Sequence, residues 1–350
     1  MNRLVINVAV IGFGKLGLLH AGTVSGLAGS RLAVAVDSNK TLLNALKAKM
    51  EGTRIYTRHE PLLKDGGIDA AFIATPTGTH VDIALDCVEQ GIPIFIEKPL
   101  ALSGEQARPL VEALEKRPVA NMVGYMGRYL DTFAKAKEIV DSGVLGPLEM
   151  LRCSMYIGQL FKAGKGWRYD KGVSGGGVLI TQNSHVIDKL VWMFGDVDWV
   201  SGQTNSLYST EVEDHAHVFF AFRNGLRGFM DASWSERHYR TPTIAIHVQG
   251  RNGTLDVDDD SVRLFLDAKS DAYAEGWSEW RKPDLYRSVP FDIGGPQYTL
   301  QAEEFLTAVR GGPNPASDVR SAYAVQCVID AAYMSAERNG APIRIAEVMA

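Results

Sequence analysis

The chain has 350 residues and a formal net charge of −5 at pH 7; 46% of its residues are hydrophobic and 22% are charged. A chain of this length usually forms two domains, and the composition is typical of a soluble globular protein. The acidic balance provides no positive surface for nucleic acid or an anionic membrane, and no apolar run is long enough to span a bilayer. Three widely spaced cysteines (Cys87, Cys153 and Cys327) favour a reducing, cytoplasmic location without disulfides or a zinc framework.

A glycine-rich loop follows the first apolar run. Residues 5–11 read VINVAVI and predict a buried strand, after which GFGKLG leads into a helical stretch that ends near residue 28. In a dinucleotide site the first glycine permits the turn, the second lets the backbone approach the pyrophosphate, and the third allows close helix–strand packing. The helix N-terminus then offers its N–H groups to the phosphates. The expected cofactor contacts are Gly12, Phe13, Gly14, Lys15, Leu16 and Gly17. A glycine turn without a cofactor is the alternative.

The acidic end of the next strand indicates which dinucleotide is bound. Residues 32–36 are apolar and end in Asp37, about twenty residues after Gly17, the spacing at which a carboxylate bonds the adenosine ribose. A carboxylate there repels a 2′-phosphate, so Asp37 and Ser38 favour NAD over NADP. Asn39 and Lys40 could soften that preference.

Strands and helices alternate up to about residue 125. Strands are predicted at 68–74, 94–98 and 118–123, and helices at about 80–90 and 103–116. This order predicts an α/β Rossmann domain, a doubly wound parallel sheet, over residues 1–125. Ligands of such sheets lie beyond the carboxyl ends of the strands. The expected contacts there are Thr75, Pro76, Thr77, His80, Glu97 and Lys98. Loop 75–80 could also be a turn that caps the next helix.

Lys98 ends the run Ile94–Pro99. Because a proline keeps the preceding residue extended, the strand is expected to continue through Lys98. A lysine held dehydrated beside a cofactor has a lowered pKa, which suits it to proton transfer. A solvated lysine at a strand end is the alternative. Glu97 is expected to point to the other side of the strand.

Beyond residue 125 strand-like runs follow one another. They occupy residues 148–157, 197–205, 214–222, 226–235, 242–249 and 254–266. Successive strands without crossover helices predict an α+β domain with a large, mostly antiparallel sheet over residues 126–350. Helical patterns return at about 297–310 and 318–338, and the C-terminal helix could pack back on the first domain. The segment 268–295 shows no assignable pattern.

A predicted helix at 175–194 carries a polar stripe. At 100° per residue, Thr181, His185, Asp188 and Trp192 share one side of an otherwise apolar helix. Histidine suits the removal of a proton from an alcohol near neutral pH. The alternative is a core histidine bonded to Asp188.

Two other polar groups have weaker interpretations. The loop 158–174 could clamp an anionic group through Trp167 and Arg168, whereas its lysines are expected to be solvated. Glu211, Glu213, His215 and His217 alternate along one strand face in a pattern that resembles a set of metal ligands. With no converging partner apparent elsewhere, we interpret them as a polar sheet face and predict no metal site.

Together these motifs resemble the glucose–fructose oxidoreductase/inositol dehydrogenase (Gfo/Idh/MocA) family over nearly the whole chain. The resemblance rests on the glycine loop, ATPTGTH at 74–80, EKP at 97–99, VGYMGRY at 123–129 and SGGG…H..D at 174–188. It implies a Rossmann domain and a C-terminal open-faced sheet that often builds dimers or tetramers. It also implies NAD(P)-dependent oxidation or reduction of a sugar or cyclitol hydroxyl. The family's catalytic lysine maps onto Lys98 and its histidine onto His185.

Two positions depart from the family pattern. Thr181 stands where the family often has an aspartate four residues before the histidine, which excludes a three-residue proton relay. Gly127 stands where inositol-oxidising relatives tend to carry arginine, which lowers the expectation of myo-inositol as substrate.

The resulting prediction is an NAD-dependent dehydrogenase of a sugar or polyol, in which Lys98 and His185 handle the proton. Alternatives are a dehydrogenase of phosphorylated or nucleotide-linked sugars, suggested by the basic loop, and a non-catalytic NAD-binding sensor, suggested by Thr181. A homodimer or homotetramer is expected. The remaining expected cofactor contacts are Arg128, Trp167 and Arg168. The expected substrate contacts are Lys98, Tyr125, Met126, Tyr156, Arg168, Thr181, Gln182, His185 and Arg240.

Overall fold

The structure is a computed structural model that describes residues 5–47 and 50–349. By their internal contacts the residues form two compact units. The first comprises Met1–Met126 and Ser288–Tyr323, and the second comprises Gly127–Arg287 and Ala324–Ala350. Helix α12 (Val319–Glu337) runs from one unit into the other.

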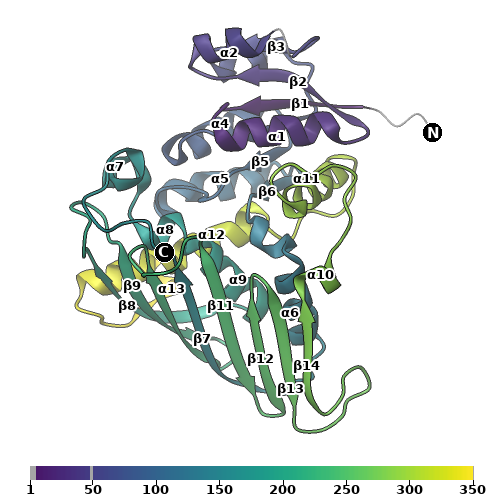
Figure 1. Ribbon diagram of the computed structural model, residues 1–350. Helices are drawn as coiled ribbons and strands as arrows, with labels where there is room; N and C mark the ends of the chain where they lie inside the picture. Colours follow the sequence, from purple (N-terminus) through teal and green to yellow (C-terminus); the bar gives the residue numbers. More distant parts are fainter. Residues whose placement is uncertain (1–4, 48–49, 350) are drawn as a thin grey trace. The chain divides into compact units, whose positions relative to one another are not determined.

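The first unit contains a six-stranded parallel sheet in the order β3-β2-β1-β4-β5-β6 (Figure 1). The strand order reverses between β1 and β4, which are neighbours, and this reversal is the point at which doubly wound sheets bind ligands. The predicted Rossmann fold is confirmed. The strands are β1 (Ile6–Ile11), β2 (Ser30–Val36), β3 (Arg54–Tyr56), β4 (Ala70–Ile73), β5 (Ile94–Ile96) and β6 (Asn121–Val123).

Helices connect these strands in the alternating order that the sequence predicts, although no element was predicted between residues 40 and 65, where the structure has two helices and β3. Helix α5 (Gly104–Lys116) begins where it does because the Ser103 hydroxyl accepts a hydrogen bond from the Gln106 amide at 3.2 Å. Strand β5 ends at Ile96, so the predicted extension through Lys98 is wrong: the chain turns at 98–100 instead. The other helices of this unit are α1 (Lys15–Gly26), α2 (Lys40–Lys47), α3 (His59–Asp65), η1 (Thr77–Thr79), α4 (His80–Glu89) and α11 (Pro296–Val309).

Helix α11 belongs to the first unit although it comes late in the chain. Its Phe305 packs edge-on against Phe72 of β4 and Phe95 of β5, with ring centroids 5.3 and 5.8 Å apart. Phe72 and Phe95 themselves stack at 4.6 Å. The expected second domain was one continuous stretch, 126–350. The contacts instead group residues 288–323 with the parallel sheet, because the apolar side of α11 is buried on it.

The second unit is built on a nine-stranded sheet in the order β14-β13-β12-β11-β7-β10-β9-β8-β15 (Figure 1). The β10–β7 pair is parallel and the other neighbours are antiparallel, which confirms the predicted mostly antiparallel sheet. The strands are β7 (Leu148–Tyr156), β8 (Val197–Asn205), β9 (His215–Phe222), β10 (Arg227–Ser233), β11 (Thr243–Gly250), β12 (Gly253–Asp258), β13 (Ser261–Leu266), β14 (Gly276–Arg281) and β15 (Ile343–Arg344).

One face of this sheet is covered and the other is open. Along β9, Ala216, Val218 and Phe220 are buried, whereas Phe219 between them is 38% exposed. Phe229 of β10 is 42% exposed on the same open face, where it pairs with Phe219. The helices of this unit are η2 (Met126–Tyr129), α6 (Asp131–Asp141), η3 (Trp167–Tyr169), α7 (Lys171–Ser174), α8 (Val178–Thr181), α9 (Ser184–Phe194), α10 (Lys282–Leu285), α12 and α13 (Ile345–Met349).

One predicted strand is divided in the structure, and one unassigned segment contains regular elements. The single strand expected at 254–266 is the hairpin β12–β13, because the Asp258 carboxylate accepts the amides of Asp260 and Ser261 and closes a turn. The unassigned segment 268–295 contributes β14 and α10. Over residues 5–47 and 50–349, no helix has both the length and the apolar character needed to cross a membrane.

Candidate cofactor and catalytic site

The glycine loop has the shape that a dinucleotide requires. Gly12 has a positive φ of 94°, and a Cβ there would lie 2.6 Å from the Ala74 carbonyl oxygen. A Cβ on Gly17 would collide with the Gly12 carbonyl oxygen, whereas no described heavy atom lies within 4 Å of one built on Gly14. No described side chain caps α1, so its first N–H groups face this open space. The residues fit a bound pyrophosphate.

Asp37 joins the glycine loop to the end of β2. Its Oδ2 accepts a hydrogen bond from the Phe13 amide at 2.6 Å, and its Oδ1 accepts one from the Asn39 amide at 2.7 Å. These bonds fix a half-buried carboxylate beside the loop, where a ribose would lie in a dinucleotide complex. Ser38 next to it is exposed.

The loop at Thr75–His80 is held by the imidazole of His80. The buried ring faces two carbonyl oxygens, that of Thr75 at 2.8 Å from Nε2 and that of Pro99 at 3.0 Å from Nδ1. Burial lowers the pKa of His80, although hydrogen bonding to the two carbonyl groups opposes this shift. His80 thus connects the loop after β4 to the turn that carries Lys98.

Beneath Lys98 lies an acid–base pair that the sequence analysis missed. The Glu97 carboxylate is buried, and its Oε1 lies 2.6 Å from Nε2 of His20 on α1. The His20 ring also packs against Phe95 and Phe72. Lys98 itself is half-buried, and its backbone amide donates to the Glu97 carboxylate at 3.3 Å. The available signal was a histidine three residues after Gly17 on the packed side of the helix. Glu97 and His20 therefore fix the backbone of the Lys98 turn.

In the second unit, the predicted helix 175–194 is interrupted. Helix α8 ends at Thr181 and α9 begins at Ser184, because both the amide and the side-chain Nδ2 of Asn183 donate to the Val178 carbonyl at 3.0 Å. The single polar stripe is therefore wrong, since a helical spacing does not hold across the break. His185 lies half-buried in the first turn of α9.

The start of α8 is anchored by Glu213, which the sequence analysis assigned to a polar sheet face. Its buried carboxylate accepts the amides of Gly177 and Leu179 at 2.8 and 2.9 Å and the Tyr333 hydroxyl at 2.8 Å. Burial raises the pKa of Glu213, and these three bonds oppose the rise. The Thr181 hydroxyl donates to the Gly177 carbonyl at 2.7 Å, so Glu213 positions the segment that carries Thr181.

Arg128 is buried in an ion pair. Its guanidinium donates from Nε and Nη2 to the carboxylate of Asp188 on α9, at distances of 2.6 to 3.1 Å. The ring of Trp192 lies 5.7 Å from the Arg128 Cζ. Burial raises the pKa of Asp188, and the charge of Arg128 acts against the rise. Asp188, expected either to line the polar stripe or to bond His185, thus serves as the bidentate acceptor of Arg128.

Two family profiles match the chain. One, described as "Oxidoreductase family, NAD-binding Rossmann fold", matches residues 6–125, and the other, described as "GFO/IDH/MocA C-terminal domain", matches residues 133–256. Together they span more than half of the chain. The chain belongs to the Gfo/Idh/MocA family of oxidoreductases. The predicted family is confirmed.

Similar proteins cover nearly the full chain. The scyllo-inositol 2-dehydrogenase (NAD(+)) of Bacillus subtilis (strain 168) is 27% identical over 355 residues, which include 97% of this chain and 96% of that protein. GenD2 from gentamicin A biosynthesis, solved in complex with NAD, superposes with a TM-score of 0.78 and 27% identity over 97% of this chain and 96% of that one. Levoglucosan dehydrogenase, solved with NADH and L-sorbose, superposes with a TM-score of 0.87 over 99% and 100%. At 21% identity this last likeness shows the fold alone.

The remaining predicted site residues of this Gfo/Idh/MocA protein have varied surroundings. Tyr125 is buried, and the Gln182 side chain accepts a hydrogen bond from the Trp234 indole. Tyr156 lies on the open sheet face, where its hydroxyl donates to Asp231 at 2.7 Å. The loop residues are more exposed: Trp167 is 58% exposed, with Arg168 stacked 5.4 Å from its ring. Three of the predicted residues are half-buried: Leu16, Thr75 and Met126. Buried residues include Phe13, Gly17 and Thr77. Exposed residues include Lys15, Pro76, Lys162, Lys165, Lys171 and Arg240.

Gly127, one of the two departures from the family, makes room for a buried lysine. A Cβ at residue 127 would meet Cε of Lys189 at 2.9 Å, and would also clash with its Nζ. That Nζ lies 4.5 Å from the ring centroid of Phe133. Burial lowers the pKa of Lys189 to about 8, although the charges of Asp259 and Asp188 oppose the shift. A larger side chain at 127 would therefore require the end of the Lys189 side chain to move.

Lys189 should make the free energy of unfolding increase with pH in the alkaline range. Its pKa in the folded chain is about 8, below the ordinary lysine value of about 10.4. Between these values the unfolded chain binds a proton that the folded chain has released, so the free energy of unfolding rises with pH. Relative to Lys189→Met, the wild type should gain on the order of 2–3 kcal/mol between about pH 7 and pH 10. Urea unfolding across this range measures it. The exposed Lys116→Met variant should show the same dependence of unfolding free energy on pH as the wild type. If Lys189→Met also shows the wild-type dependence, the lowered pKa of Lys189 is refuted.

Proposed function

We propose that the protein oxidises a secondary hydroxyl of a sugar or cyclitol with NAD, or catalyses the reverse reduction. The observation that carries this proposal is the arrangement at the carboxyl edge of the parallel sheet. The glycine loop after β1, Asp37 after β2 and Lys98 after β5 follow strands of one sheet, and this edge is where doubly wound folds bind ligands. The named activity of the Bacillus subtilis relative, dehydrogenation of scyllo-inositol, supports the same substrate class.

Two side chains would handle the proton. NAD, when bound, supplies a hydride acceptor for the substrate carbon. His185 would accept the hydroxyl proton as its oxygen becomes a carbonyl, and Lys98 would hydrogen-bond the same oxygen or share the proton transfer. Thr181 carries no charge and already donates its hydroxyl proton to the Gly177 carbonyl, so it would bind substrate only through its oxygen lone pairs.

Asp37 should decide the cofactor. Its carboxylate would bond the ribose hydroxyls of NAD and repel a 2′-phosphate, so Asp37→Ser should lower kcat/KM for NAD by about 10–100-fold, the value of one or two charged hydrogen bonds. The same change should raise the relative use of NADP. Rates with both cofactors measure it. Asp69 is a matched control, because it accepts the Asn7 amide at 2.7 Å at the opposite end of β1. An NAD-to-NADP ratio that does not change in Asp37→Ser would contradict the role.

The test of function is a substrate screen. The protein is incubated with NAD and a panel of neutral cyclitols and sugars, and NADH is followed by its absorbance. Turnover of neutral substrates is expected. A second panel contains sugar phosphates and nucleotide sugars. Turnover of this panel alone would favour the second candidate function, a dehydrogenase of anionic sugars, which the exposed Lys162, Lys165 and Lys171 support. A relative of the same fold was solved with UDP-GlcNAcA and NADH. If neither panel gives substrate-dependent formation of NADH, the remaining alternative is the non-catalytic NAD-binding sensor.

We also infer a homodimer or homotetramer formed through the open sheet face. Phe219 and Phe229 pair across β9 and β10 and expose aromatic surface there, and Trp199 of β8 stacks on Phe219 at 5.7 Å. Exposed aromatic patches of this kind mark association surfaces. A monomer mass in sedimentation analysis at micromolar concentration would contradict the inference.

A further inference from the structure

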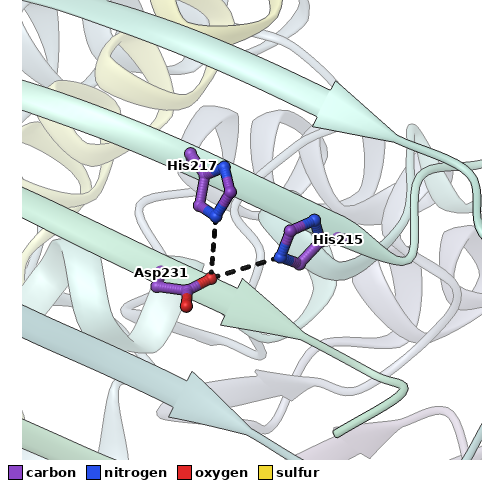
Figure 2. A group of neighbouring side chains, drawn as sticks. All are labelled: His215, His217 and Asp231. Carbon is purple, nitrogen blue, oxygen red and sulfur yellow. Dashed lines mark ion pairs between the residues drawn. The ribbon is translucent and has the colours of Figure 1, made fainter.

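Two histidines and an aspartate converge on the open face of the sheet in the second unit. His215 and His217 are alternate residues of β9, and Asp231 of β10 lies directly opposite His217. The Nε2 atoms of both imidazoles lie 3.3 Å from the same oxygen, Oδ1 of Asp231. Figure 2 shows both rings turned toward this oxygen. Strand pairing thus supplies the converging partner that the sequence pattern lacked.

The distances are longer than those of an ordinary histidine–carboxylate hydrogen bond. On the same sheet, Nδ1 of His247 lies 2.6 Å from the Asp256 carboxylate and forms such a bond. By contrast, Oδ1 of Asp231 is buried and accepts no hydrogen bond from any residue within the described ranges. The two imidazoles lie at the same distance from one oxygen, within ion-pair range if they are protonated, but neither forms a hydrogen bond with it. The two nitrogens and the oxygen therefore form a compact group of three atoms.

The spacing is that of ligands around a tetrahedral metal ion. Bonds of about 2.0–2.2 Å from zinc to nitrogen and oxygen make the edge of the tetrahedron about 3.3–3.5 Å long. The three ligand atoms lie within 4.8 Å of one another, and the two nitrogen-to-oxygen distances match this edge. Two imidazole nitrogens and one carboxylate oxygen are also a donor set that zinc accepts.

A fourth side chain holds the carboxylate in this orientation. The Tyr156 hydroxyl donates to Oδ2 of Asp231 at 2.7 Å, which leaves Oδ1 for the histidine side. Outer partners of this kind orient metal ligands and strengthen binding. Tyr156 and Asp231 also border a groove of about 580 Å³ on the open face.

We propose that His215, His217 and Asp231 bind one zinc ion per chain. Three protein ligands leave a fourth position for water. His215, His217 and Asp231 belong to the second unit, whereas the glycine loop and Lys98 belong to the first. The proposal stands whether or not the dehydrogenase activity is found.

Metal titration of the full-length chain, without an affinity tag, tests the proposal. Chelator-treated protein is titrated with Zn²⁺ by calorimetry and with Co²⁺ as a visible-absorption probe of four-coordinate geometry. We expect one ion per chain. His215→Gln, His217→Gln and Asp231→Asn should each weaken binding at least about tenfold, and Tyr156→Phe should weaken it about 10–100-fold. Zn²⁺ should raise the Tm of the wild type and not of the ligand variants.

His247→Gln is the matched control, because it removes a histidine that bonds a carboxylate on the same sheet. It should bind Zn²⁺ as the wild type does. Binding that is absent in the wild type, or that falls equally in His247→Gln and His217→Gln, overturns the proposal. Thermal unfolding without metal identifies any variant that fails to fold, and the other two ligand variants then decide the outcome.

Discussion

Lys98→Met is expected to lower kcat for NADH formation by about 10²–10⁴-fold, the range that a positioned proton-transfer group contributes. Methionine preserves the length and apolar stem of the half-buried side chain and removes its ammonium group. The substrate oxygen would then lose the partner that assists its deprotonation. Binding of NAD should change little, because the glycine loop and Asp37 remain. Steady-state rates on the best substrate of the screen, with a fluorescence titration of NADH, measure both quantities.

The control for this variant is Lys116→Met, at the exposed last turn of α5 in the same unit. It should retain wild-type kcat. Thermal unfolding should show that Lys98→Met still folds, since the turn is also held by His80 and Glu97 through backbone groups. Undiminished kcat in the folded variant would remove Lys98 from the mechanism.

Arg128→Met should cost about 3–5 kcal/mol of unfolding free energy, because it leaves the Asp188 carboxylate buried without its bidentate partner. The pKa of Asp188, already raised by burial, would rise further once the opposing charge is lost. Urea unfolding at neutral pH measures the change. The double variant Arg128→Met with Asp188→Leu should recover much of the loss, because the uncompensated charge is then absent.

The exposed pair of Arg58 and Glu60 provides the contrast. Arg58→Met should leave stability unchanged within error, since solvent screens that pair. Equal effects of the Arg58 and Arg128 variants, or a double variant less stable than Arg128→Met alone, would show that the buried pair does not stabilise the unit as described.

The local pattern of the sequence determined the first unit well. Alternating strands and helices predict a parallel sheet because most of the strands are apolar runs and the connections between them are long enough for a helix. The glycine spacing and the position of Asp37 also predict the dinucleotide loop, because this motif depends only on residues close together in the chain. The succession of strands after residue 126 likewise predicts an antiparallel sheet. All of these are features of period and spacing.

Tertiary structure decided which polar groups meet. Strand pairing brings Asp231 to His215 and His217. Glu213 accepts hydrogen bonds from the start of α8, which is distant in sequence. Arg128 forms an ion pair with Asp188. No spacing along the chain encodes these partners. A buried polar group must find a partner, but packing selects which one. Helix α11 belongs to the first unit because its apolar face packs on the parallel sheet and not on the elements next to it in the sequence.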